Sequence, residues 1–412
     1  MASTMTPGWY GADPEDPGYR DDPYPGYRVL REQQPVNLTP AGHWRISRYN
    51  DVVRLLRELP VGMRLTNGLL PGQSPGEELD RSGAFMLQQD PPVHTRLRKL
   101  VSKAFTPRAV ESWRPRVEAI AHERIDGVVD AGRMDLIADY ARPIPATLIC
   151  ELLGVPVEDR DRFTIWTADA THALATSRKL TDAPDVAARV EQAALSLAGY
   201  FNGLIEERRA ERSDDLLGVL IAAEEDGDRL SGPELLSQSI GLLIAGFETT
   251  IGLIGNGLVE LMRHPEEMEK LRAEPALVES AVEECLRCAA PVPLTIRVTH
   301  EDCDFDGIVI PRDSQVFAML AGANRDPERF DDPERFDISR YARDPETPAH
   351  LSFGGGTHHC LGAHLARMEA QVALAVIVDR SRDLELESDR IEWGRSLFRV
   401  PGRIPIRFRA AG

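Results

Sequence analysis

The sequence predicts a mainly α-helical fold with a minor β portion. Two observations favour the helices: residues 94–222 carry a mostly helical apolar pattern, and residues 235–262 form the longest apolar helix candidate. A third observation adds the β portion, because short strand-like runs gather mainly in the C-terminal third. No Gly-rich phosphate loop follows a strand, so nothing in the sequence predicts a nucleotide-binding domain.

The chain is expected to begin with a poorly ordered segment, because residues 1–21 are rich in Pro, Gly, Asp and Tyr. The length of 412 residues suggests two or three domains, but large single domains reach this size, and residues 22–412 are expected to form one. Residues 61–89 form a long Gly- and Pro-rich loop of the kind that is usually functional or disordered. The other predicted elements are helices at 22–33 and 49–59, a strand at 44–47, strands at 294–298, 305–310 and 315–320, and strand pairs over 391–408.

The chain is strongly acidic. Its 412 residues include 48 Lys and Arg and 66 Asp and Glu, which gives a net charge of −18. Such a chain is a poor general binder of nucleic acid, so we expect no nucleic-acid partner. No secretory signal opens the chain, and no run is expected to be long and apolar enough to span a bilayer. We therefore expect a cytoplasmic protein with no membrane attachment.

Five cysteines are present, Cys150, Cys285, Cys288, Cys303 and Cys360. Their odd number and irregular spacing argue against a disulfide framework. Cys285 and Cys288 form a C-x-x-C pattern, but no second Cys or His pair accompanies it. We therefore interpret that pattern as incidental and not as a zinc site.

The most informative segment is Phe353–Gly362, with the sequence FGGGTHHCLG. Three consecutive glycines before Cys360 let the backbone turn sharply and approach a flat surface closely. The residues that follow are mostly helix-forming, so Cys360 is expected near a helix N-terminus, where the helix dipole and free N–H groups favour a thiolate. A thiolate so placed can ligate haem iron, whereas the alternative is a buried structural cysteine beside a turn.

This segment matches the F-G-x-G-x-H-x-C-x-G signature of the cytochrome P450 family at every fixed position, and the chain resembles the soluble bacterial branch of that family. The resemblance implies the cytochrome P450 fold, which is a helical domain plus a small β-rich region around a buried haem b, within residues 22–412. It also implies that Cys360 is the metal ligand. The signature residues expected to contact the haem are Phe353, Gly354, His358, Cys360 and Gly362.

Other basic residues resemble the family's haem-propionate contacts. His94-x-x-x-Arg98 places two basic side chains on one helical face, where they could hold anionic propionates. By the same resemblance Arg297 and His358 are the remaining contacts. Surface solvation is the alternative for any one of these residues alone, but the set in this order favours propionate binding.

Glu284-x-x-Arg287 puts a carboxylate and a guanidinium on one face of a predicted helix. Apolar neighbours such as Leu286 indicate burial, and a buried pair needs further partners to be satisfied. The resemblance supplies Arg335, from a meander over residues 323–337, as that partner. The expected role of all three is structural.

The segment 245–250, with the sequence AGFETT, lies inside the long apolar helix. Small residues there let a ligand approach the helix backbone, and a Thr hydroxyl can bond back to a carbonyl and bend the helix. An unpaired Glu is costly to bury in such a helix, which favours a function. By resemblance this is the oxygen-activation segment, in which Ala245 and Gly246 contact the haem, Thr249 hydrogen-bonds dioxygen and Glu248 relays protons.

The resemblance places a substrate pocket between the 61–89 loop, the long helix, the 292–296 strand and the 396–398 turn. An apolar lining implies an apolar small molecule, such as a polyketide, terpenoid, steroid or fatty acid. Arg64 and Arg81 are candidate charged anchors, with surface exposure as the alternative. The expected ligand-facing residues, each of which could equally be plain core, are Met86, Leu87, Leu243, Val292, Leu294, Ile296, Leu397 and Phe398.

The resemblance implies a monooxygenase that inserts one oxygen atom from dioxygen into its substrate. Electrons would come from a ferredoxin or flavodoxin with its NAD(P)H-dependent reductase, and we expect the enzyme to be a monomer. Arg96, Lys99 and Lys103 form a candidate basic patch for such a partner, with plain solvated charge as the alternative. A peroxygenase and a non-catalytic haem protein are the competing hypotheses, and the Glu248–Thr249 pair favours dioxygen over peroxide.

Overall fold

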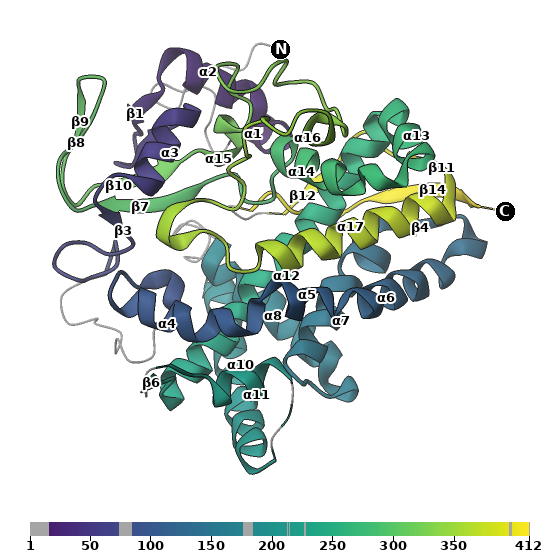
Figure 1. Cartoon of the computed structure of the whole chain (residues 1–412), viewed down its shortest axis with the longest axis horizontal. Helices are drawn as coiled ribbons and strands as arrows, with labels where there is room; N and C mark the ends of the chain where they lie inside the picture. Colours follow the sequence, from purple (N-terminus) through teal and green to yellow (C-terminus); the bar gives the residue numbers. More distant parts are fainter. Residues whose placement is uncertain are drawn as a thin grey trace.

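The computed structural model describes residues 16–73, 85–175, 184–211, 213, 215–225, 228–394 and 398–411. Helices fill most of the molecule, and a five-stranded sheet lies to one side of them (Figure 1). The main apolar core lies among the helices, and a second apolar cluster packs between the sheet and α3 (Tyr49–Arg57). The predicted mainly helical fold with a minor β portion is therefore confirmed.

The remaining helices follow in chain order. They are α1 (Pro17–Asp21), α2 (Tyr24–Gln33), α4 (Val93–Val101), α5 (Pro107–Glu111), α6 (Arg114–Asp126), α7 (Pro143–Leu152), α8 (Arg160–Ala175), α10 (Pro184–Ala210), α11 (Leu216–Ala222), α12 (Gly232–Arg263), α13 (Pro265–Ala273), α14 (Val278–Cys288), α15 (Leu320–Ala323), α16 (Arg340–Arg343) and α17 (Ala363–Arg380). Short helical turns include η2 (Met86–Gln88), η3 (Ser102–Phe105), η8 (Gly356–His358) and the π-helical η5 (Leu136–Ala141).

The strands form one larger sheet and several small ones. The larger sheet has the order β1-β2-β10-β7-β3, in which only the β2–β10 pair is parallel. Its strands are β1 (Val36–Leu38), β2 (Trp44–Ile46), β3 (Val61–Gly62), β7 (Thr295–Thr299) and β10 (Gln315–Ala318). The others are β4 (Arg133–Asp135), β11 (Ser381–Leu386) and β14 (Pro405–Ala410) in a three-stranded sheet, and the pairs β5–β6 (Glu224–Glu225, Asp228–Arg229), β8–β9 (Cys303–Phe305, Ile308–Ile310) and β12–β13 (Glu392–Trp393, Pro401–Arg403).

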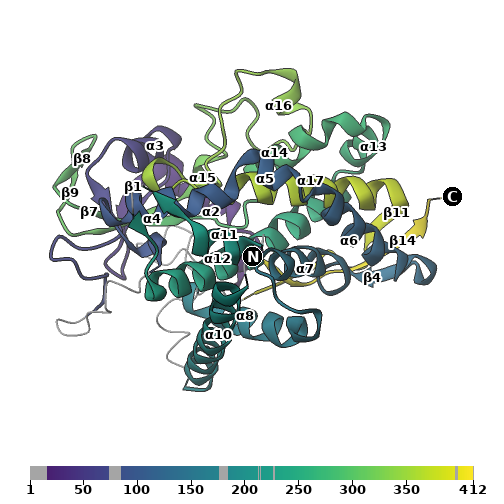
Figure 2. The ribbon, with the colours of Figure 1, turned by 60° about the horizontal axis from the view of Figure 1, so that its bottom comes forward.

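Helix α12 runs through the interior of the helical part, as the two views together show (Figures 1 and 2). Ser231 starts it with a capping box, since its hydroxyl accepts from the Glu234 N–H while the Glu234 carboxylate accepts from the Ser231 N–H. Contrary to expectation, α12 is long and apolar enough to cross a membrane, with a mean hydropathy of 1.5 over its most apolar 18 residues. Since 72% of that window is buried inside the protein, the apolar surface of α12 is satisfied by core packing.

Three predicted boundaries are wrong. Helix α1 lies inside the segment expected to be poorly ordered, and Asp16 caps it by accepting a hydrogen bond from the Gly18 N–H; residues 1–15 lie outside the described part of the chain. The single strand predicted at 305–310 is instead interrupted by the turn of the β8–β9 hairpin. Phe305 ends β8, Asp306 and Gly307 form the turn with positive φ angles of 52° and 88°, and Ile308–Ile310 is β9. The strand predicted at 315–320 ends at Ala318, and Leu320 begins α15.

Candidate active site

The loop before α17 is shaped by two glycines with different tasks. Gly354 and Gly356 have φ angles of +68° and +65°, which side-chain-bearing residues rarely adopt. A Cβ on Gly354 would find open space apart from the His358 carbonyl at 4.0 Å, whereas a Cβ on Gly356 would lie 1.9 Å from the Leu56 carbonyl oxygen of α3. The Cys360 N–H donates to the Phe353 carbonyl at 2.9 Å and closes the loop.

Cys360 differs from the other four cysteines, all of which are buried and free, because its side chain is exposed. It lies three residues before α17, whose first helical residue is Ala363. Surrounding protein still raises the pKa of the Cys360 thiol, against the lowering influence of the Gly362 N–H, Arg98 and Arg367. The helix N-terminus expected from the sequence is present, but its lowering effect on the thiol pKa is smaller than the raising effect of desolvation. A bound metal ion would supply the charge that deprotonates a coordinating thiol.

Four basic residues from three elements gather near this loop. The rings of His94 (α4) and His358 (η8) have centroids 4.1 Å apart, and burial together with the charges of Arg297 and Arg98 lowers the pKa of His358 to about 3. Arg297 (β7) is buried, and desolvation lowers its pKa to about 10. Arg98 donates to the His359 carbonyl at 2.7 Å and so ties α4 to the Cys360 loop.

This cluster is electrostatically incomplete on its own. The buried ring nitrogens His94 Nδ1 and His358 Nε2 have no hydrogen-bond partner among the described residues. Burial and the charges of Arg98 and Arg297 lower the pKa of both histidines, so that two arginine cations and two unpartnered ring nitrogens lie together. Two carboxylates of a haem, placed beside an accessible cysteine, have the charge and the chemistry that this set lacks. The residues present therefore fit a haem group.

Across α12, the segment 245–250 has the local geometry predicted for it. Thr249 Oγ1 donates to the Ala245 carbonyl at 2.8 Å, and Thr250 Oγ1 donates to the Gly246 carbonyl at 3.0 Å. Ala245 is exposed, and a Cβ added to Gly246 would meet no atom within 4 Å. Burial raises the pKa of Glu248 to about 7, with Arg142 acting in the opposite direction. This face of α12 thus combines open backbone, a hydroxyl and a carboxyl group that titrates near neutrality.

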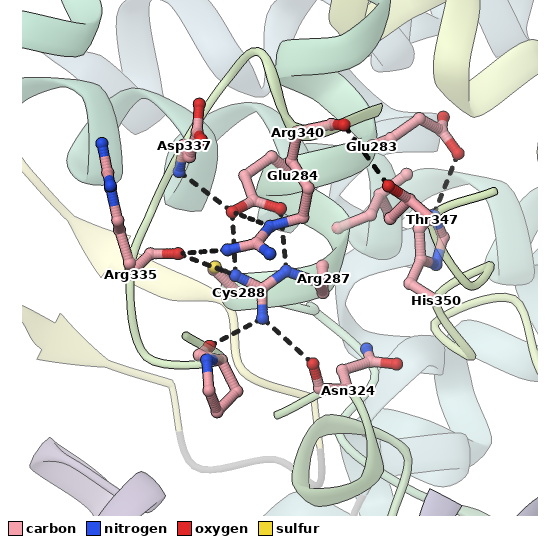
Figure 3. Close-up of polar contacts among 12 residues, drawn as sticks. Glu283, Glu284, Arg287, Cys288, Asn324, Arg335, Asp337, Arg340, Thr347 and His350 are labelled. Atoms are coloured by element: carbon pink, nitrogen blue, oxygen red, sulfur yellow. Dashed lines mark hydrogen bonds and ion pairs between the residues drawn. The ribbon is translucent and has the colours of Figure 1, made fainter. Parts of the chain in front are cut away.

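The predicted pair Glu284–Arg287 is fully buried in α14, with two hydrogen bonds of 2.8 Å (Figure 3). Its third member is not Arg335, as expected, but Arg340, whose Nε donates to Glu284 Oε1 at 3.2 Å. The Arg335 side chain is exposed, and the residue contributes its backbone carbonyl, which accepts from Arg287 Nη2 at 2.9 Å. Arg340 reaches Glu284 because it begins the short helix α16 beside α14.

Comparison with known proteins decides the family. Residues 74–387 match the family model described as cytochrome P450. The chain is 40% identical to cytochrome P450 monooxygenase PikC of Streptomyces venezuelae, covering 94% of this chain and 91% of the relative, and 40% identical to the vitamin D(3) 25-hydroxylase of Pseudonocardia autotrophica, covering 93% of each. The solved structure of the bacillaene polyketide synthase P450 PksS of Bacillus subtilis superimposes with a TM-score of 0.86 at 33% identity, over 96% of this chain and 99% of that one.

This chain belongs to the cytochrome P450 family. It has the family's fold, and it is a cytochrome P450 monooxygenase of the bacterial type. Family membership agrees with the fit of the residues around Cys360 and with the open face of α12. Cys285 and Cys288 of the C-x-x-C pattern are both buried and free. No group of three or more His, Cys, Asp or Glu side chains that could hold a metal ion occurs in the described ranges, and the interpretation of the pattern as incidental stays a prediction.

The residues expected to line the substrate pocket of this P450 differ in how far they are exposed. Leu87 is exposed, and Val292, Leu294, Ile296 and Phe398 are half-buried. Met86 is buried, and its N–H donates to Gln238 of α12 at 3.1 Å. Leu243 has no exposed surface and packs in the helical core, which corrects its assignment to the pocket. Leu397 and Arg81 lie outside the described residues.

Two charged residues of this P450 also differ from expectation. Arg64 is buried and donates to the Gly68 carbonyl at 2.9 Å, so it is held within its own loop. Arg96 forms ion pairs with Glu234 in the first turn of α12 and with Asp228 in β6, so its charge is neutralised and it does not belong to an open basic patch. Lys99 and Lys103 are exposed.

Two residues near the site, Phe85 and Glu283, were not predicted from the sequence. Phe85 packs against Gly241 so closely that an added Cβ would lie 2.2 Å from the ring. Gly241 is one helical turn before Ala245, and this glycine within an apolar helix was the available signal. The second is Glu283, which binds Arg367 and His350. The sequence gives no signal for Glu283, because the Glu284-x-x-Arg287 motif assigns a role to Glu284 alone.

Proposed function

We propose that this P450 binds haem b through the thiolate of Cys360 and oxidises an apolar small molecule with dioxygen. The observation that most strongly supports this proposal is a cluster of basic residues beside the accessible Cys360. The cluster has two unpartnered buried ring nitrogens and consists of His94, Arg98, Arg297 and His358. In this proposal the four basic residues hold the two propionates, and Phe353, Gly354 and Gly362 shape the loop around the ligand. When bound, the haem supplies the electron-transfer and dioxygen chemistry that the side chains lack.

The α12 residues then handle protons. The Thr249 hydroxyl donates to the Ala245 carbonyl at 2.8 Å, which leaves its oxygen lone pairs available as an acceptor on the exposed face. Glu248, with a pKa raised to about 7, carries a proton in roughly half of the molecules at neutral pH and can deliver it. Ala245 and Gly246 keep that face free of side-chain bulk. This acid–alcohol pair supports dioxygen as the oxidant over peroxide.

The substrate is proposed to be an apolar molecule of moderate size, within the polyketide, terpenoid, steroid and fatty-acid classes. Three half-buried apolar residues, Val292, Leu294 and Ile296, support this choice. Two relatives support the same choice, since they are named 6-deoxyerythronolide B hydroxylase and vitamin D(3) 25-hydroxylase and are 38% and 40% identical to this chain. Substrate-induced shifts of the Soret band, recorded across a panel from all four classes, test this proposal.

Electrons are proposed to come from a separate ferredoxin or flavodoxin with its NAD(P)H-dependent reductase. The enzyme that receives them is proposed to be a cytoplasmic monomer with one catalytic domain. Lys99 and Lys103 support docking of an acidic partner, because they are exposed on and after α4, the helix that Arg98 ties to the Cys360 loop. Reduction by ferredoxin should slow as ionic strength rises, because exposed charges are screened. A rate that is independent of salt would contradict electrostatic docking.

Cys360→Ser tests the ligand assignment. The wild-type protein should show the reduced, carbon-monoxide-bound Soret band typical of thiolate-ligated haem, and the variant should lose that band while other cysteines remain. Turnover with the ferredoxin system should exceed turnover with hydrogen peroxide. A wild-type band typical of His ligation would overturn the proposal, and faster turnover with peroxide would favour a peroxygenase.

A further inference from the structure

Glu283 and Glu284 are neighbours on α14 but serve different parts of the molecule. Successive residues of a helix point in directions about 100° apart. Glu284 faces Arg287 and Arg340, whereas Glu283 points away from them toward His350 (Figure 3). The structural network around Glu284 therefore does not account for Glu283.

Glu283 is the centre of its own ion-pair group. Its Oε1 and Oε2 accept from Arg367 Nε and Nη2 at 2.6 and 2.9 Å, and Oε2 lies 3.2 Å from His350 Nε2. His350 Nδ1 accepts from the Ser352 N–H at 3.2 Å, so Nε2 carries the proton that is donated to Glu283. Although burial acts to raise it, these hydrogen bonds hold the pKa of Glu283 at about 2. Glu283 is therefore an anion with a fixed bidentate partner.

Both partners of Glu283 contact Phe353. The Arg367 guanidinium lies over the Phe353 ring, 4.5 Å from its centroid, and the His350 ring lies 5.7 Å from it. Phe353 in turn accepts the Cys360 N–H through its carbonyl oxygen at 2.9 Å. One carboxylate thus positions an aromatic ring and a cation behind the proposed iron ligand.

We infer that the Glu283–Arg367 ion pair, braced by His350, positions Phe353 behind the Cys360 loop and sets how readily the bound haem accepts an electron. This inference rests on the proposed function, since it needs Cys360 as the haem ligand. The positive charge of Arg367 favours an added electron, and the negative charge of Glu283 opposes it. Substituting one or the other should therefore change the reduction equilibrium in opposite directions.

The test measures the equilibrium constant for reduction of the haem-loaded protein against a reference dye. Arg367→Gln should lower that constant and Glu283→Gln should raise it, each by about three- to tenfold. The double variant Glu283→Gln/Arg367→Gln should return near the wild-type value, because the net charge change is zero. A purely structural role predicts shifts of the same sign for both single variants, which would overturn the inference.

Two further variants keep the test decisive. Glu151→Gln removes another bidentate carboxylate, paired with Arg116 at 2.7 and 2.6 Å, and should leave the constant unchanged, since Arg116 lies in α6 and does not belong to the Glu283–Arg367 group. If Glu283→Gln binds no haem, Arg367→Lys, which keeps the charge, should stay closer to wild type than Arg367→Gln. Equal effects of those two would overturn the inference. The wild-type carbon-monoxide spectrum tests the proposed function separately.

Discussion

At the scale of single residues, the three glycines before Cys360 illustrate how one residue type meets different demands. Gly354 needs only its positive φ angle, because almost nothing lies near an added Cβ. Gly356 needs the same backbone conformation and also the space, because α3 lies directly against it. Gly355 has an extended φ of −168°, which any residue can adopt. A pattern of three glycines predicts the turn but not which glycine also makes the close contact.

Gly354→Ala should lower stability by about 1–2 kcal/mol, the usual cost of a positive φ in a side-chain-bearing residue. Gly356→Ala should cost roughly 2 kcal/mol more, because its Cβ would overlap the Leu56 carbonyl and force the backbone apart. Thermal unfolding midpoints and the haem-to-protein ratio measure the two effects. Equal losses of stability for the two variants would show that the close contact of Gly356 with α3 adds nothing to the cost of the substitution.

Glu248 gives the site a pH dependence of its own. Burial raises its pKa to about 7, so the side chain is protonated below that pH and loses its proton above it. If it delivers protons, product formation per NAD(P)H consumed should fall as pH rises through about 7. Glu248→Gln should reduce turnover by at least about tenfold and flatten the profile, whereas Glu248→Asp should keep part of the activity. An unchanged profile in Glu248→Gln would exclude this role.

At the scale of elements, the buried network around α14 depends on how the meander over residues 323–337 passes beside that helix. Arg287 donates to three backbone carbonyls, those of Asn324, Pro333 and Arg335, at 3.1, 2.7 and 2.9 Å. The backbone of the meander thus folds around one guanidinium, which is why the pair is stable without solvent (Figure 3). The sequence identifies the pair through its spacing on a helix, but its third partner comes from α16, more than 50 residues later.

Arg340→Ala should destabilise the protein by about 2–4 kcal/mol, because it leaves a buried carboxylate with one cation fewer. Arg335→Ala is the matched control, and it should change stability by less than about 0.5 kcal/mol, since only its backbone takes part. Denaturant unfolding of the two variants measures the difference. A loss of stability with Arg335→Ala as large as that with Arg340→Ala would indicate that the Arg335 side chain stabilises the Glu284–Arg287 pair, as the sequence analysis expected.

At the scale of the whole molecule, Glu369 is a buried carboxyl group in α17, and its Oε2 has no hydrogen-bond partner among the described residues. Burial raises its pKa to about 8. The folded protein therefore holds a proton that the unfolded chain releases above its ordinary pKa of about 4.3. Stability should consequently fall as pH rises from about 4 to about 8, where the full cost is reached.

Glu369→Gln removes this titration. Relative to the variant, the wild-type protein should lose about 1.4 kcal/mol per pH unit in the steepest part of that interval. Urea unfolding at pH 5.5, 7 and 8.5 measures the difference, and Glu385→Gln, a substitution in an exposed pair with Arg407, serves as the control. Parallel pH profiles for wild type and Glu369→Gln would show that the carboxyl group is solvated after all.

The sequence by itself determined the class of fold, a long apolar helix over 235–262 that the structure extends to Gly232–Arg263, and the loop that presents Cys360. Each depends on local rules, since periodicity, capping and glycine conformation act within a few residues. The tertiary structure alone decided that Arg340 and not Arg335 reaches Glu284, that Arg96 is neutralised by Glu234, and that Leu243 lies in the core. These outcomes depend on contacts between distant segments, whose distances and desolvation no local pattern contains.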